Sequence, residues 1–391
     1  MRYGFKDVVI DSRTGLNPRK NFVLGSGENN YITIKDIYNG QVNITDKTDK
    51  VDDDAIQIIK KRSRIKVGDI LFVSIGRIGE TAIVTAKDDT WDVNESVFVF
   101  TINREIITPE YFCTLFQSNA VQKYLTGNSS GSTFKSIKMN QLEKMVFDLP
   151  PLVIQEGITE KLSKLKAIIN LRTSELTYLD DLIKARFVEL FGTYPANEKN
   201  WAKGTIRDLV TEVRYGSSRK AADGDSGKYP YLRMNNITYG GELDLTETKT
   251  ISIPDEELDK CTVRRGDLLF NRTNSKELVG KTCVYDRDEM MVLAGFVVRV
   301  RLNEKALPEF VSAFMNTDFS KQMLLGMCKA AIGQANINAQ EFQNIGIYIP
   351  PIEIQTQFAA FKEQVDKSKD AVKINAKMFV FKNQKQLPKK E

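Results

Sequence analysis

The sequence has 391 residues, of which 41% are hydrophobic and 27% are charged, and its formal net charge is +5. This length suits two domains with connecting segments, and no apolar run approaches the roughly 18 residues that suggest a membrane span. Histidine is absent, which excludes Ser-His-Asp, Cys-His, HNH-type and HExxH chemistry. Residues 353–391 hold nine basic and five acidic side chains, so the basic excess lies in the tail and overall charge alone does not indicate nucleic-acid binding.

The chain reads as a tandem repeat. "DVVIDSRTG" from Asp7 aligns with "DLVTEVRYG" from Asp208, which matches Arg13 with Arg214 and Gly15 with Gly216. Four further pairs keep the offset between 198 and 201 residues: "YITIKDIYNG" with "YLRMNNITYG", "VGDILF" with "RGDLLF", "PEYF" with "PEFV", and "IKMNQL" with "INAQEF". One structural unit written twice, with one function duplicated, is the simplest interpretation.

Each repeat is expected to be mixed α/β. Strands are predicted for "YITIKDI", "DILFVSIG" and "SVFVFTI", and again for "YLRMNNI", "DLLFNRT" and "GFVVRVRL", because these segments are rich in β-branched and aromatic residues. Helical spacing follows in "PEYFCTLFQSNAVQKYL" and "PEFVSAFMNTDFSKQMLL", each with Pro and Glu at its start. Glycine-rich loops come next, at residues 127–131 and 326–333.

A long helix is predicted after each diproline, in "PPLVIQ" from Pro150 and "PPIEIQ" from Pro350. The fixed φ of proline ends the preceding strand and sets the direction of the helix. Apolar residues at coiled-coil spacing follow, with Arg172 and Arg186 interrupting the first series and Ser368 and Asn375 the second. The predicted seam is Ile158, Leu162, Leu165, Ile169, Leu176, Leu179, Ile183, Phe358, Phe361, Val365, Val372 and Phe379.

Two arrangements fit these heptads. Each helix can pack on its own domain as an ordinary amphipathic helix, or the two can pair. The matched pattern favours pairing. A helix over residues 158–190 would span roughly 50 Å, and an antiparallel partner would give a pseudo-twofold molecule that holds two domains at a fixed spacing, as two separated DNA half-sites require.

This order of elements, with "LPPLVIQ", a helix ending in "KARFVELFG", a tryptophan and then "IPPIEIQ", resembles the specificity subunit of type I restriction-modification systems. The resemblance covers essentially the whole chain. It implies two target-recognition domains, at residues 1–152 and 193–352, and two long spacer helices, at 153–192 and 353–391, the second with a basic tail. The fold class is then α/β (α+β), with the two helices forming an antiparallel coiled coil.

The resemblance also implies the partners. Each domain would read one half of a split, asymmetric site in double-stranded DNA. The subunit would recruit two methyltransferase subunits, which use S-adenosylmethionine, and two restriction subunits, which are translocase-nucleases. This chain would bind no cofactor itself. The second helix departs from the pattern, because its apolar positions are weaker and its end, "KNQKQLPKKE", is rich in lysine.

No catalytic centre is predicted. "DLPPL" at Asp148 differs from the [ND]PP[YFW] motif of adenine methyltransferases, with Leu149 inserted and Leu152 in place of the aromatic residue. "PDEELDK" at Pro254 crowds its acids into one expected loop, unlike a nuclease motif. Cysteines form no CxxC pair, which favours inert buried thiols, no metal site and a reducing cytoplasm; they are Cys113, Cys261, Cys283 and Cys328.

DNA contacts would come from basic and amide side chains near strand ends and turns. For any one of them, a solvated charge or a local salt bridge is an equally good interpretation. The basic pair at 19–20 recurs at 219–220, and "SSGSTFKS" from Ser129 is either a phosphate contact or an ordinary flexible loop. The candidates are Arg13, Arg19, Lys20, Lys35, Arg77, Arg214, Arg219, Lys220, Arg233, Arg272, Asn274 and Lys276. A rival hypothesis is a non-catalytic protein-binding scaffold, which the near-neutral charge of the domains favours.

Overall fold

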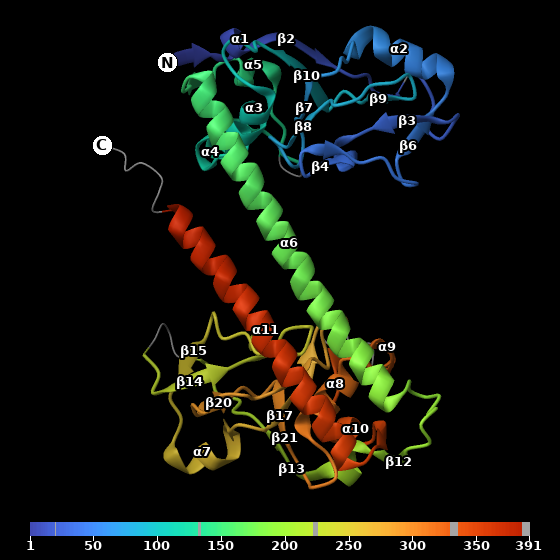
Figure 1. The fold of residues 1–391 in the computed structure, drawn as a ribbon, viewed down its shortest axis with the longest axis vertical. Coiled ribbons are helices and arrows are strands. Elements are labelled where there is room, and N and C mark those ends of the chain that lie inside the picture. The colour runs from blue at the N-terminus through green and yellow to red at the C-terminus, as the bar shows by residue number, and fades with distance from the viewer. Residues whose placement is uncertain (20, 132–133, 222–225, 329–334, 385–391) are drawn as a thin grey trace. The chain divides into compact units, whose positions relative to one another are not determined.

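The computed structural model describes residues 1–19, 21–131, 134–221, 226–328 and 335–384, with side chains described as far as Ile374 (Figure 1). The chain divides into two compact units, Met1–Ile168 and Ile169–Glu391. Both contain strands and helices, as the sequence predicts. No helix among the described residues combines the length and apolar character needed to cross a bilayer.

The first unit is built on an antiparallel sheet in the order β2-β10-β7-β8. A three-stranded sheet, β6-β3-β9, lies beside it, and two short pairs, β1-β11 and β4-β5, complete the strands. The strands are β1 (Arg2–Gly4), β2 (Val9–Thr14), β3 (Asn29–Ile32), β4 (Ile37–Tyr38), β5 (Gln41–Val42), β6 (Asp49–Val51), β7 (Ile70–Val73), β8 (Thr81–Ile83), β9 (Trp91–Val93), β10 (Val97–Ile102) and β11 (Val146–Asp148). The helices are α1 (Phe5–Val8), η1 (Ile34–Asp36), α2 (Asp53–Ser63), α3 (Pro109–Phe116), α4 (Asn119–Asn128), α5 (Met139–Leu142) and α6 (Leu152–Phe191).

The second unit repeats this plan. Its main sheet is β13-β21-β17-β19, and the second sheet, β15-β14-β20-β16, gains one strand. The strands are β12 (Ala202–Thr205), β13 (Val210–Tyr215), β14 (Tyr229–Leu232), β15 (Lys249–Ile251), β16 (Thr262–Val263), β17 (Leu268–Asn271), β18 (Thr273–Asn274), β19 (Thr282–Val284), β20 (Met291–Leu293), β21 (Val297–Leu302), β22 (Ala335–Asn336) and β23 (Gly346–Ile349). The helices are η2 (Ile206–Leu209), η3 (Met234–Asn236), α7 (Asp255–Cys261), α8 (Pro308–Met315), α9 (Asp318–Met327), α10 (Ala339–Gln343) and α11 (Ile352–Gln384).

The matched glycines sit where the chain passes close to its own backbone. A Cβ on Gly15 would lie 1.7 Å from the carbonyl oxygen of Val93, and one on Gly216 would lie 2.2 Å from that of Leu293. Any side chain would therefore push β2 or β13 away from the neighbouring sheet. This steric limit accounts for the glycine match between the repeats.

Three sequence expectations need correction. The strands predicted for "YITIKDI" and "YLRMNNI" break into 3-10 turns η1 and η3, because a side chain caps the turn from within: Thr33 N–H donates to Asp36 at 2.8 Å, and Arg233 N–H donates to Asn236 at 2.9 Å. The helical segment that begins at each PE pair is two helices and not one, since Ser118 and Thr317 act as N-caps that start the second helices, α4 and α9. The acids of "PDEELDK" lie on helix α7 and not in a loop.

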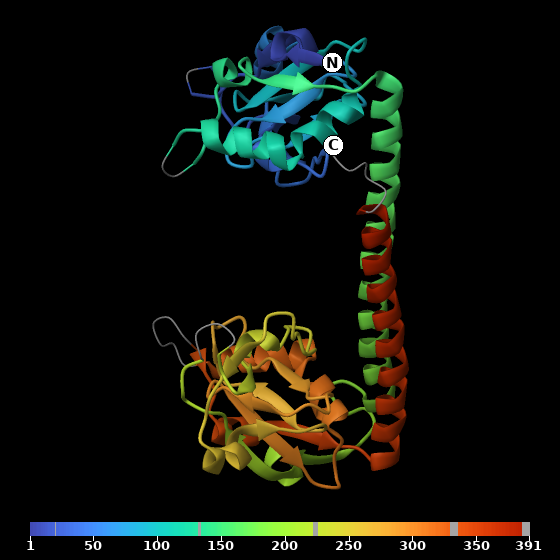
Figure 2. The same cartoon turned by 90° about the vertical axis from the view of Figure 1, so that its left-hand side faces the viewer.

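Each diproline does lead from a strand into a long helix, from β11 to α6 and from β23 to α11. Within the second unit the two helices run antiparallel, because Phe187 packs on Phe358 while Asp180 lies beside Lys369 (Figure 2). Three predicted seam residues of α11 are buried here, Phe358, Val365 and Val372, and Phe361 stacks beneath the Arg186 guanidinium. The antiparallel pairing is thus confirmed over this segment.

The remaining seam residues are less uniform. On α6, Leu162 and Ile169 are 38% and 45% exposed, and Ile158, Leu165, Leu176, Leu179 and Ile183 are half-buried. The Phe379 side chain lies outside the described residues. Ser368 is exposed, and the polar residue that enters the helix interface is its neighbour Lys369. The predicted heptad pattern therefore placed the polar interface residue one position too early, at Ser368 instead of Lys369.

Candidate nucleic-acid interface

The strand ends of each unit meet through the same main-chain hydrogen bonds. In the first unit, Ser74 N–H donates to the carbonyl of Ser96 at 3.0 Å and Ile137 N–H donates to the carbonyl of Ser74 at 2.9 Å. In the second, Arg272 N–H donates to Phe296 at 3.0 Å and Ile337 N–H to Arg272 at 2.9 Å. We call these segments the strand-end frame, residues 14–16, 74–76, 94–97 and 136–137 and their counterparts 215–217, 272–274, 294–297 and 336–337.

Arg13 lies inside the first unit, 7% exposed. Its guanidinium contacts Asp69 at 2.9 Å and also donates to Thr101 and to the carbonyl of Arg64. Asp69 is itself buried, 2% exposed. The ion pair ties β2 and β10 to the turn before β7, so Arg13 has a structural role and we leave it out of the DNA contacts proposed below.

The matched residue Arg214 differs. It is exposed and lies 3.8 Å from Glu212. In the second unit Asp267, the counterpart of Asp69, pairs at 2.9 Å with Arg301 from the opposite strand, and Arg299 fills the buried space and binds Glu212. Burial would raise the pKa of Glu212, but the guanidinium groups of Arg299 and Arg301 lower it. The buried aspartate is therefore paired with an arginine of β2 in the first repeat and with an arginine of β21 in the second.

The other first-unit candidates lie on its surface. Arg19 is exposed in the loop after β2. Lys35 pairs with Asp49 at 2.9 Å, and Arg77 donates to the carbonyl of Ile34 at 2.8 Å, so η1 brings Lys35 and Arg77 together. Lys20 lies outside the described residues, as do residues 132–133 of the "SSGSTFKS" loop. Phe134 in that loop is 71% exposed.

The second-unit candidates gather more closely. Arg272 and Asn274 lie in the strand-end frame, and Lys276 follows on the exposed turn. The Arg272 guanidinium stacks 4.9 Å from the ring centre of Tyr215, and Asn274 donates to Asn271 at 2.9 Å. Sequence reasoning missed Tyr215 and also Phe296, which is 51% exposed. A position-by-position comparison of the two repeats could have found them, because both aromatic residues stand where the first repeat has a small hydroxyl residue.

Three further candidates flank this cluster. Arg219 pairs with Glu257 at 2.6 Å, Lys220 is exposed beside it, and Arg233 caps η3. The hydrogen bonds that Arg219 donates to the Glu257 carboxylate raise the pKa of Arg219 and lower the pKa of Glu257. Arg219 can reach a phosphate only by leaving this carboxylate.

A buried glutamine joins each domain to its long helix. The side chain of Gln155 donates to the carbonyls of Ile106 and Pro150 at 2.8 and 2.9 Å and accepts from Thr108 N–H at 3.1 Å. Gln355 repeats this, donating to Lys305 and Pro350 at 2.9 and 2.8 Å and accepting from Leu307 N–H at 2.8 Å. Both side chains are fully buried. The glutamine that ends each PPxxIQ motif therefore connects the start of the long helix to the loop before α3 or α8.

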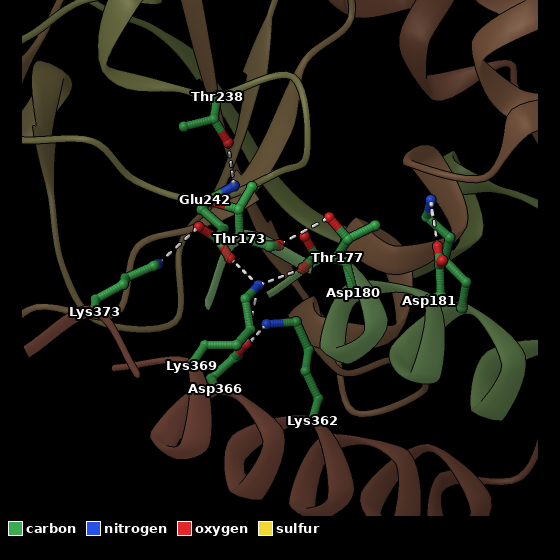
Figure 3. Close-up of polar contacts among 11 residues, drawn as sticks. Thr173, Thr177, Asp180, Asp181, Thr238, Glu242, Lys362, Asp366, Lys369 and Lys373 are labelled. Carbon is green, nitrogen blue, oxygen red and sulfur yellow. Dashed lines mark hydrogen bonds and ion pairs between the residues drawn. The ribbon is translucent and has the colours of Figure 1, made fainter. Parts of the chain in front are cut away.

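A buried lysine links the second domain to both long helices, as Figure 3 shows. Lys369 of α11, 4% exposed, contacts Asp180 of α6 at 2.5 Å and also Glu242 in the loop after η3. Burial would lower the pKa of Lys369, but the two carboxylates raise it. Burial would likewise raise the pKa of Glu242, and Lys369 and Lys373 lower it. Position 169, the counterpart of Lys369, is isoleucine.

The remaining candidates for metal binding or a reactive thiol are the acidic and cysteine side chains of the described residues. No group of three or more His, Cys, Asp or Glu side chains among them is placed to hold a metal ion. Cys261 and Cys283 are buried, whereas Cys113 and Cys328 are only half-buried, which corrects the expectation of four buried thiols. Burial raises the pKa of the Cys113 thiol to about 11, so it stays protonated and weakly nucleophilic at neutral pH.

Comparison with known proteins explains the repeat. The family described as the type I restriction modification DNA specificity domain matches residues 5–178 and again residues 198–377. The chain belongs to this family. Each match spans one domain and part of the helix that follows it, so the family unit corresponds to one repeat.

Individual relatives are distant. The chain is 22% identical over 276 residues to the type I restriction enzyme EcoKI specificity subunit of Escherichia coli (strain K12), an alignment covering 67% of this chain and 59% of that protein. It thus spans less than two thirds of that relative's length. The S subunit of a type I restriction-modification system from M. genitalium is 12% identical, with a TM-score of 0.56 and coverage of 98% and 94%. A second solved structure comes from work on complex assembly and conformational transition of the type I R-M system. Its chain is 16% identical to this one, with a TM-score of 0.55, and the match covers 98% of this chain and 94% of that chain. At these identities the two structures show a shared fold.

Proposed function

We propose that this chain is the DNA sequence-specificity subunit of a type I restriction-modification complex. Each domain would read one half of a split, asymmetric target in double-stranded DNA. The observation that best supports this proposal is the duplicated strand-end frame, which has the same main-chain hydrogen bonds in both units but different side chains. A shared frame gives both domains the same way of approaching DNA, and different side chains give each its own bases.

Basic side chains on the surface would supply the phosphate contacts that position each domain. The contacts we propose are Arg19, Lys20, Lys35 and Arg77 in the first domain, and Arg214, Arg219, Lys220, Arg233, Arg272, Asn274 and Lys276 in the second. Because several are held by local carboxylates, binding by the chain alone should be weak and should fall steeply as salt rises. A protein-binding scaffold would not give that slope with DNA.

The chain would be non-catalytic and would act by placing its partners on DNA in the cytoplasm. We expect methyltransferase subunits, two per complex, to modify adenine with S-adenosylmethionine, and two restriction subunits to cleave. The long helices are the elements best suited to hold these partners, since many of their outward side chains lie exposed outside the two domain cores.

A domain exchange tests this function. Residues 1–150 are replaced by the equivalent domain of a relative, the chain is expressed with its methyltransferase subunits, and methylated adenines are mapped by single-molecule sequencing. One half of the methylated site should change and the other should stay the same. An unaltered site after the exchange would contradict the proposal.

A further inference from the structure

Three of the matched positions at which the strand-end frame differs between the domains lie next to one another in the sheet. Thr14 and Tyr215 pair with the same place on the neighbouring strand, opposite Phe98 and Val298. Ser74 matches Arg272 and Ser96 matches Phe296, because each pair shares the same main-chain hydrogen bond. The first domain thus carries three small hydroxyl residues where the second carries tyrosine, arginine and phenylalanine.

The first domain shows that the fold does not need the larger set. There the Ser74 hydroxyl donates to the Ser96 carbonyl at 2.7 Å, and Thr14 accepts from Arg62 at 3.2 Å, which closes the frame locally. In the second domain Tyr215 and Phe296 leave 45% and 51% of their surface exposed. Tyr215 stacks on the Arg272 guanidinium and the Phe296 carbonyl accepts from Arg272 N–H, so two partly exposed aromatic residues adjoin the arginine at positions where the first domain has small side chains.

Arg272 is oriented before any ligand arrives. Its guanidinium lies against the Tyr215 ring, and the Tyr215 hydroxyl accepts from Ala339 N–H at 3.1 Å, which fixes the ring. The Nε of Arg272 is buried with no hydrogen-bond partner among the described residues. Stacking on an aromatic face restricts an arginine to one plane while its outer nitrogens stay able to donate.

We infer that Arg272, held by Tyr215 and flanked by Phe296, reads a guanine in the half-site of the second domain. A planar guanidinium that donates two parallel hydrogen bonds matches O6 and N7 of guanine in the major groove. The first domain, with Thr14, Ser74 and Ser96 at these places, reads its half-site without an arginine there. This inference rests on the proposed function and names the residues that distinguish the two halves of the target.

The test uses Arg272→Lys and Arg272→Gln in the full chain, assembled with methyltransferase subunits, and maps methylated adenines in cells. Lysine keeps the charge but replaces the planar guanidinium, which stacks on Tyr215, with a flexible point charge, so a phosphate contact would survive the change and a base contact that depends on the fixed plane would be weakened. At one guanine of the second half-site, discrimination against other bases should fall by about tenfold to a hundredfold for both variants. The first half-site should remain unchanged, which also shows that the variants fold and assemble.

The matched control is Arg265→Gln, which removes an exposed arginine of the same domain that pairs with Asp288 at 2.7 Å. It should leave the stringency of both half-sites unchanged. The inference is overturned if the second half-site contains no guanine, if both Arg272 variants keep wild-type stringency, or if they weaken methylation equally for all sequences. Absence of any split site in the wild type would instead refute the proposed function.

Discussion

The two domains share a fold but are joined to the long helices differently. In the described part of the first domain the main apolar cluster ends at Leu149, before α6 begins, and Gln155 makes the junction. In the second, Phe187 and Phe191 of α6 and Phe358 of α11 belong to the domain core, and Lys369 adds a polar link. The comparison teaches that a repeat can keep its internal frame while its attachment to the long helix changes from polar contacts, made by Gln155 and Lys166, to a continuous apolar core.

The largest expected effect separates two arginines that the sequence matches. Arg13→Met should destabilise the first domain by about 3–5 kcal/mol, because Asp69 stays buried without its counter-charge. Arg214→Met should change the second domain by no more than about 0.5 kcal/mol, as exposed residues usually do. Urea unfolding followed by fluorescence measures both, since Trp91 reports the first domain and Trp201 the second when the other is replaced by phenylalanine. Equal losses would show that the two arginines have the same role.

The next effect concerns the glutamine connectors. Gln155→Leu and Gln355→Leu should each cost about 2–4 kcal/mol, because each leaves several buried main-chain groups without partners. The two substitutions should differ in how much they loosen the start of the adjoining helix. Amide hydrogen exchange in the first turn of α6 should rise more for Gln155→Leu than exchange in the first turn of α11 rises for Gln355→Leu, since Phe358 still anchors α11. The reverse order would contradict the proposed difference between the junctions.

A smaller effect is expected at the polar link. Lys369→Met should cost about 1–2 kcal/mol, less than a fully buried pair, because Asp180 and Glu242 keep access to water. Lys367→Met, on the exposed side of the same helix, is the control and should have almost no effect. Because the pKa of Glu242 is lowered, the wild-type advantage should be complete above the ordinary glutamate range and shrink as pH falls through the lowered pKa. An advantage that does not change with acidity would argue against this ion pair.

The smallest effect is a pH dependence confined to the second domain. Burial lowers the pKa of Lys321 to about 8, whereas its counterpart in the first domain is Gln122. Between this pKa and the ordinary lysine value the unfolded chain binds more protons, so Lys321 makes stability rise with pH in that window. Lys321→Gln should be more stable than wild type at pH 7, and the difference should narrow between pH 8 and 10. Trp201 fluorescence in urea checks this, and parallel curves for the two proteins would refute it.

The repeat and the long helices were predictable because they depend on patterns within one segment. Proline fixes the turn before each helix, and apolar spacing marks its buried side, so Phe358 and Val365 fell where expected. The split of "YITIKDI" was harder to foresee, because Asp36 caps a turn inside a segment whose composition favours a strand. Local hydrogen bonding outweighed β propensity there.

The surroundings of the predicted site residues were harder to foresee, since charge in a sequence does not reveal its partner. Arg13 and Arg214 occupy matched positions, yet one is buried on Asp69 and the other is exposed, because Arg301 on the opposite strand serves the second domain. Tyr215 and Phe296 carry no charge and so escaped a search for phosphate contacts. Lys369 was not part of the predicted seam, which had Ser368 as its polar residue, yet Asp180 of α6 and Glu242 of the domain both contact it.

The strand-end frame is held by main-chain atoms, and this has an evolutionary consequence. A surface whose shared hydrogen bonds are between main-chain atoms can exchange serine for arginine or threonine for tyrosine and keep those bonds. New recognition can then arise by a few substitutions, with folding stability left largely intact. Under the proposed function, such a surface would let DNA specificity change quickly while the fold is retained.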